Sequence, residues 1–126
     1  MTKEEIMTGN KIMAEYLGYV YYPHTKPYGR DNVVGWLKPK MSPKNPHFYL
    51  CRSHRDLPFY NSWDALMRVV DKIESGGVSV GISPMSVAVH NGVTAYAFER
   101  GFDDKLKATW RVCLKYINRN DRRREN

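Results

Sequence analysis

Residues 86–99 read SVAVHNGVTAYAFE, and in this stretch two alternating apolar runs flank an Asn-Gly pair. Asn91 and Gly92 both tolerate positive φ, which makes the pair a strong hairpin signal. With a two-residue turn at this pair, His90 lies opposite Val93. An antiparallel hairpin with one apolar face favours a sheet that helices cover. The register predicts one face made of Val87, Val89, Tyr96 and Phe98, and another made of Ala88, His90, Ala95 and Ala97.

Three segments with apolar residues at helical spacing lie around the predicted strands. Thr2 and Glu5 form a capping-box pattern, which predicts a helix over residues 3–17 that ends at Gly18. A second helix is predicted to begin after Asn61 or Ser62 and to end at Ser75-Gly76-Gly77, and a third to follow Asp103 or Asp104 with an apolar stripe that ends at Ile117. In the second helix, Trp63 is expected to pack beneath the preceding loop.

The remaining β-prone runs alternate with these helices. They are residues 19–22, 32–37, 47–52 and 78–82. The order helix, hairpin, helix, hairpin, helix predicts an α+β fold, an α-ββ-α-ββ-α sandwich whose mainly antiparallel central sheet is covered by three helices. We expect a single domain over residues 1–118 with a Pro-rich basic loop insertion at 39–59, and a basic C-terminal tail at 119–126.

Charge is distributed unevenly along this chain of 126 residues with a formal net charge of +7. Residues 26–55 hold seven basic residues and one acidic residue, and residues 105–126 hold eight basic and two acidic residues. The cations of the first segment alternate with aromatic side chains, a pattern typical of surfaces that stack on nucleotides and neutralise phosphate. The predicted ligand-binding residues are Lys26, Arg30, Trp36, Lys38, Lys40, Lys44, Arg52 and Arg55. Arg119 and the arginines after it are interpreted as a solvated helix end.

Three residues near the Pro-rich stretch invite a chemical interpretation. His47, Cys51 and His54 are spaced as metal ligands can be, but they lack the paired short spacings of zinc sites. A reduced protein with two cysteines ordinarily buries them, so Cys51 is not expected to act as a nucleophile. We therefore predict no catalytic residue, no metal ligand and no cofactor.

Other features of the sequence indicate the compartment in which the protein acts. The longest apolar runs are much shorter than the roughly 18 residues that a membrane span needs, so no membrane partner is expected. The N-terminus begins with Met1-Thr2-Lys3-Glu4-Glu5, which does not fit a signal peptide. These patterns predict a location in the cytoplasm.

Several short stretches have to be considered together. They are Leu57, Tyr60, Ser62-Trp63-Asp64, Leu66-Met67, Val69-Val70 and Lys72-Ile73-Glu74, with Asn10-Lys11-Ile12-Met13-Ala14 and Gly35-Trp36 before them and Lys105-Leu106-Lys107-Ala108-Thr109 after them. In these stretches the sequence resembles small uncharacterised proteins of bacteriophages and prophages, described as the phage ABA sandwich domain type. This resemblance implies helices on both faces of a central sheet, a phage or prophage accessory role in the cytoplasm of a bacterial host cell, and no catalytic residue or cofactor to carry over.

Three functional hypotheses follow. The leading one is a non-enzymatic accessory protein that binds a host protein or an anionic ligand, a nucleotide or nucleic acid, in host takeover or counter-defence. The second is an enzyme that processes nucleotides or nucleic acid with His54 as acid or base. The third is a small virion component. The sequence leaves homo-oligomerisation open.

Overall fold

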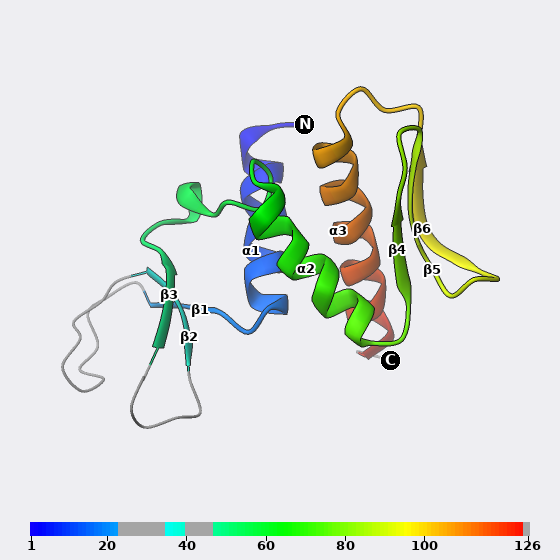
Figure 1. Cartoon of the computed structure of the whole chain (residues 1–126). Helices are drawn as coiled ribbons and strands as arrows, with labels where there is room; N and C mark the ends of the chain where they lie inside the picture. Colours follow the sequence, from blue (N-terminus) through cyan, green and yellow to red (C-terminus); the bar gives the residue numbers. More distant parts are fainter. Residues whose placement is uncertain (23–34, 40–46, 125–126) are drawn as a thin grey trace. The chain divides into compact units, whose positions relative to one another are not determined.

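The computed structural model describes residues 1–22, 35–39 and 47–124, and the side chains of these except 38–39, 47–49 and 121–124. The chain divides into two compact units, Met1–Leu57 (unit 1) and Pro58–Asn126 (unit 2). Figure 1 shows the elements of each unit. Those of unit 1 are α1 (Lys3–Tyr16), β1 (Val20–Tyr22), β2 (Gly35–Pro39), β3 (His47–Cys51) and the 3₁₀ helix η1 (His54–Asp56). Those of unit 2 are α2 (Trp63–Ser75), β4 (Ser79–Ile82), β5 (Ser86–His90), β6 (Ala95–Arg100) and α3 (Lys105–Arg124).

The predicted α+β class is confirmed, because the described residues form three α-helices and antiparallel strands. The strands form two three-stranded sheets, ordered β1-β2-β3 and β4-β5-β6, where one central sheet was predicted. Part of the predicted loop insertion at 39–59 is regular structure, since it contains β3 and η1. A single domain over residues 1–118 stays a prediction.

In unit 1, α1 begins where its capping residue predicts. The Thr2 side chain accepts a hydrogen bond from the Glu5 amide at 3.1 Å, which satisfies one of the free N–H groups of the first turn. Further along α1, the buried Asn10 donates its side-chain amide to the carbonyl of Leu57 at 3.2 Å. This bond fixes α1 to the chain that follows η1.

Strands β2 and β3 approach each other closely at Gly35. This residue has φ +133°, and a Cβ atom there would lie 2.4 Å from the carbonyl oxygen of Cys51. A side chain at position 35 would therefore push β3 away from β2. The residue sets the position of the segment after β3, which carries Arg52.

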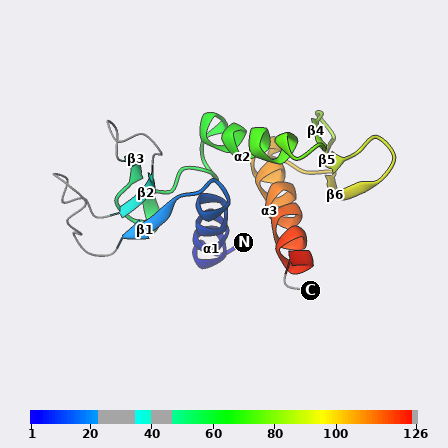
Figure 2. The same cartoon turned by 90° about the horizontal axis from the view of Figure 1, so that it is seen from below.

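Unit 2 packs two helices against one face of its sheet. Helix α2 contacts β4 while α3 contacts β5 and β6, and Figure 2 shows both helices on the same side of the three strands. Ser62 caps α2 by accepting a hydrogen bond from the Ala65 amide, and Asp104 caps α3 by accepting one from the Lys107 amide. The core side chains that the two helices supply include Leu66, Val69, Val70, Ile73, Trp110, Val112, Cys113 and Ile117.

The predicted register of the β5–β6 hairpin is wrong. His90 pairs with Ala95, and a bulge between Val89 and His90 adds one residue, so that Val89 pairs with Ala97. A bulge of one residue moves the following side chains to the opposite face. Ala97 therefore lies buried on the helix-covered face, whereas Phe98 is 58% exposed on the other.

The chemistry of the turn explains part of this shift. The Asn91 side-chain oxygen accepts hydrogen bonds from the amides of Val93 and Thr94. The amide of Gly92, which has φ +91°, donates to Nδ1 of His90. These local bonds centre the turn on Gly92 and Val93 rather than on Asn91 and Gly92.

Trp63 also differs from expectation. Its side chain is 38% exposed at the first position of α2, and Met67 one turn later is 37% exposed. The buried stripe of α2 starts instead at Leu66. The expectation that Trp63 packs in the core is therefore wrong.

Candidate functional site

An aromatic cluster lies at the end of the sheet in unit 1. The indole Nε1–H of Trp36 on β2 donates a hydrogen bond to Nδ1 of His54 on η1 at 3.0 Å. Tyr21 on β1 pairs with Trp36 across the sheet, and its ring centroid lies 4.2 Å from that of His54. The cluster therefore combines three elements that lie far apart in the sequence.

The bond from Trp36 assigns the tautomer of His54. Since Nδ1 accepts a hydrogen bond, the proton of the neutral imidazole resides on Nε2. Burial lowers the pKa of His54 below its ordinary value of 6.5, and the charge of Lys11 on α1 lowers it further. Within the described residues, Nε2 has no hydrogen-bond partner. His54 therefore carries one N–H group that a ligand can accept from, and its Nδ1 is already engaged.

Cys51, three residues before His54, is held in its protonated form. Its buried thiol donates to the carbonyl of Ser53 at 3.3 Å. Burial, with the charge of Asp56 as a second cause, raises the pKa of Cys51 to about 11. A thiol with this pKa is almost wholly protonated at neutral pH and is a poor nucleophile.

The segment that follows β3 carries two exposed cations, Arg52 just after the strand and Arg55 within η1. The hydroxyl of Ser53 donates to the carboxylate of Asp56 at 2.9 Å, so the one acidic side chain of residues 51–56 is already engaged. Neither arginine forms an ion pair with any residue in the part of the chain that the structure describes. Together with Lys11, they give this end of unit 1 a positive surface.

The predicted ligand-binding residues differ in their exposure, and several of them lie outside the described residues. Arg52 and Arg55 are exposed on one short segment, whereas Trp36 is 1% exposed and reaches the surface only through its bond to His54. The side chain of Lys38 on β2 is outside the described residues. Lys26, Arg30, Lys40 and Lys44 lie outside them altogether.

Tyr21 and Lys11 were not predicted from the sequence to belong to this site. A signal for Tyr21 was present, because it lies in the β-prone run 19–22, and a hairpin of this run with residues 32–37 brings Tyr21 opposite Trp36. Lys11 had no comparable signal, because its effect on His54 depends on the packing of α1 against η1.

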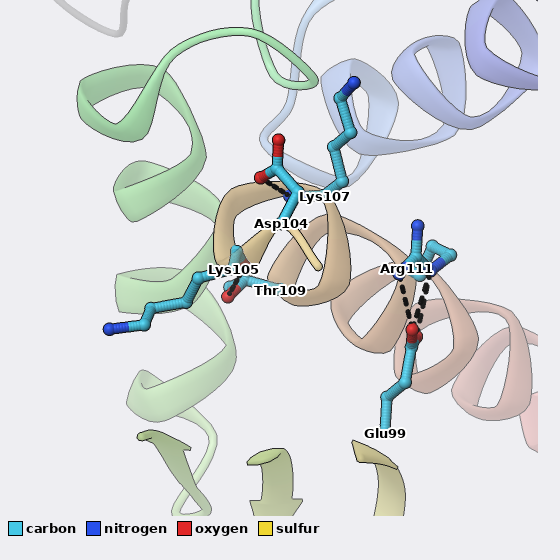
Figure 3. A network of polar contacts seen from close by, with 6 residues as sticks. All are labelled: Glu99, Asp104, Lys105, Lys107, Thr109 and Arg111. Carbon is cyan, nitrogen blue, oxygen red and sulfur yellow. Dashed lines mark hydrogen bonds and ion pairs between the residues drawn. The ribbon is translucent and has the colours of Figure 1, made fainter. Parts of the chain in front are cut away.

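Charged side chains of unit 2 form a second polar network, drawn in Figure 3. Arg111 on α3 donates from Nε to both carboxylate oxygens of Glu99 on β6, at 2.9 and 3.0 Å. The hydrogen bonds from Arg111 lower the pKa of Glu99. Further along α3, the exposed Arg119 donates to the carbonyl of Tyr96 at 2.8 Å, and its exposure agrees with the interpretation of this residue as part of a solvated helix end.

The described residues show neither a metal-binding cluster nor a membrane-spanning helix. No three His, Cys, Asp or Glu side chains among these residues gather in a way that suits a metal ion. No helix in the described ranges is both long and apolar enough to cross a membrane.

Comparison with known proteins returned no match: no family model fits the chain, and no curated protein or solved structure is significantly similar to it. The likeness to phage ABA sandwich proteins therefore stays a prediction.

Proposed function

We propose that this is a non-catalytic accessory protein of the phage or prophage type. It acts in the bacterial cytoplasm, in host takeover or counter-defence, by binding an anionic ligand of the nucleotide or nucleic-acid class. The observation that carries the proposal is the exposure of Arg52 and Arg55 on a segment that side-chain bonds hold in place. We define this anion surface by Lys11, Tyr21, Arg52, His54 and Arg55.

The anchoring of the segment favours binding. The Cys51 thiol and the Ser53 hydroxyl each make a bond within residues 51–56, and Trp36 holds His54. A ligand therefore meets cations whose backbone is already ordered, which lowers the entropy cost of association. The seven basic residues and one acidic residue of residues 26–55 add a field that attracts phosphate.

The aromatic neighbour adds a second kind of contact. Tyr21 is half-buried, and its ring contacts the imidazole of His54 at an interplanar angle of 47°. A ring held by such a neighbour keeps its orientation, which suits stacking on a base. The Nε2–H of His54 is a hydrogen-bond donor beside it.

The same geometry argues against His54 as an acid or base. A general base needs an unprotonated nitrogen that faces the substrate, and Nδ1 is occupied by Trp36. Cys51 is protonated and buried, so it provides no nucleophile beside the imidazole. Binding is therefore better supported than nucleotide or nucleic-acid processing.

Paired arginine substitutions test the proposal. Arg52→Ala combined with Arg55→Ala should weaken binding of a fluorescent single-stranded oligonucleotide by about tenfold and should reduce its salt dependence by a slope of about 1.4. The matched control is Arg68→Ala with Arg100→Ala, which removes two exposed cations from unit 2. An equal loss in both double variants, or binding that does not respond to salt, contradicts the proposal.

A further variant separates binding from catalysis. If His54→Ala abolishes turnover of a nucleotide while affinity survives, the enzyme hypothesis replaces this one. Recovery of a host protein or of virions with the purified chain, in place of nucleotide or nucleic acid, would favour the corresponding alternative.

A further inference from the structure

The sheet of unit 2 is built from a stretch with no formal charge. Residues 75–98, which contain β4, β5 and most of β6, include no Asp, Glu, Lys or Arg. Uncharged strands rich in valine and alanine pair readily with copies of themselves, because no like charges repel across the new ladder. All Asp, Glu, Lys and Arg residues of the chain therefore lie outside this stretch.

Both outer strands of this sheet have an edge that no described strand covers. Strands β4 and β6 each pair with β5 and with no other strand in the described residues. The Ser83 amide donates to the Ser86 carbonyl at 2.8 Å, so Ser83 and Ser86 form a hydrogen-bonded pair that continues the β4–β5 ladder. Hydrogen-bonded and non-hydrogen-bonded pairs alternate along an antiparallel ladder. The amides of Val80 and Ile82 therefore point away from β5. The edge of β4 therefore presents N–H groups to any approaching strand.

At each of the two outer strands, a charged side chain forms a hydrogen bond with a backbone group of the strand. A carboxylate oxygen of Glu74, at the end of α2, accepts the Val80 amide at 3.2 Å. On β6, Arg119 of α3 donates to the Tyr96 carbonyl at 2.8 Å, with its guanidinium 5.8 Å from the centre of the Tyr96 ring. Both charges come from helices, since the strands themselves carry none before Glu99.

We propose that the β4 and β6 edges are self-association surfaces that Glu74 and Arg119 keep closed, and that the partner they exclude is an edge strand of a second copy of this chain. Glu74 occupies an outward-facing amide of β4 that an added strand needs, and Arg119 places a charge at the backbone of β6. Charged side chains at strand edges are a general means of preventing edge-to-edge pairing. This inference is independent of the anion surface, which lies in unit 1.

Substitutions in the full chain test this proposal. Glu74→Ala and Arg119→Ala, alone and together, should strengthen self-association at least tenfold by light scattering after size-exclusion chromatography in 150 mM salt. Asp71→Ala and Lys115→Ala are the matched controls, because each removes the same charge one turn earlier on the same helix from an exposed residue. They should leave self-association as in the unchanged chain. Association that rises equally in the controls, or that stays unchanged in the double variant, overturns the proposal.

Two further measurements test the same roles, and the second needs no variant at all. Glu74→Gln and Arg119→Lys keep an acceptor and a donor, so they should self-associate less than the alanine variants. In the unchanged protein, the Val80 amide should exchange with solvent at least tenfold more slowly than the Ile82 amide, which faces the same edge without a carboxylate bond. Equal exchange at the two positions contradicts the role of Glu74.

Discussion

Replacement of Trp36 by Phe tests the bond that organises the anion surface. The substitution keeps an aromatic ring in the core and removes the N–H group that donates to His54 at 3.0 Å. The net contribution of such a bond is about 0.5–1.5 kcal/mol. The smaller ring also leaves space in the core, so the single variant measures both losses together.

A double-mutant cycle isolates the bond from the packing. Trp36→Phe, His54→Ala and the double variant are compared in urea unfolding followed by circular dichroism. We expect a coupling free energy of about 1 kcal/mol at pH 8. A coupling of about 0.3 kcal/mol or less lies within the additivity of independent sites and would refute the assignment.

The pH dependence of this coupling has a definite sign. The pKa of His54 is lowered in the folded protein, by burial first and by Lys11 second, from an ordinary value of 6.5. A group of this kind stabilises the fold fully above pH 6.5 and loses that contribution as pH falls through its lowered folded pKa. Protonated Nδ1 cannot accept from Trp36, so the coupling should decline over the same range. A coupling that stays constant between pH 8 and acid contradicts the assigned tautomer.

Three further outcomes are expected in unit 2. Ala97→Asp should destabilise by about 3 kcal/mol because it buries an unpaired charge, whereas Phe98→Asp should stay within about 0.5 kcal/mol of the unchanged chain in urea unfolding. The reverse order would support the register predicted from the sequence. Burial raises the pKa of Cys113 to about 12, so a thiol reagent at pH 8 should label it only after unfolding, and rapid labelling of the folded chain would count against its burial. Arg111→Met should cost about 1 kcal/mol at pH 7. That cost should vanish as pH falls from 4.5 through the lowered pKa of Glu99, so a cost independent of pH would show that packing alone is lost.

Helix positions were predictable because their signals are local. Thr2, Ser62 and Asp104 each accept a backbone amide three residues later, which is the interaction that their side chains predict from sequence. The strand runs were predictable for a similar reason, since alternation and turn residues are visible within a few positions.

Pairing between distant residues was not predictable in this way. The bulge between Val89 and His90 accompanies a turn centred on Gly92 and Val93, whereas the Asn-Gly pair alone predicts a turn centred one residue earlier. The division of six strands into two sheets depends on partners far along the chain. For the same reason the bond from Trp36 to His54 was missed, although both residues had been considered separately.

The connections between strands bear on the order in which the two sheets form. In unit 2, β4 and β5 are joined by residues 83–85, whereas in unit 1, β1 and β2 are joined by residues 23–34. The entropy cost of loop closure rises by about 0.6 kcal/mol for each doubling of length, so the longer connection costs about 1 kcal/mol more. Short connections also favour rapid folding. We therefore expect the sheet of unit 2 to form first in refolding, which shortens the time during which the uncharged residues 75–98 are exposed to other chains.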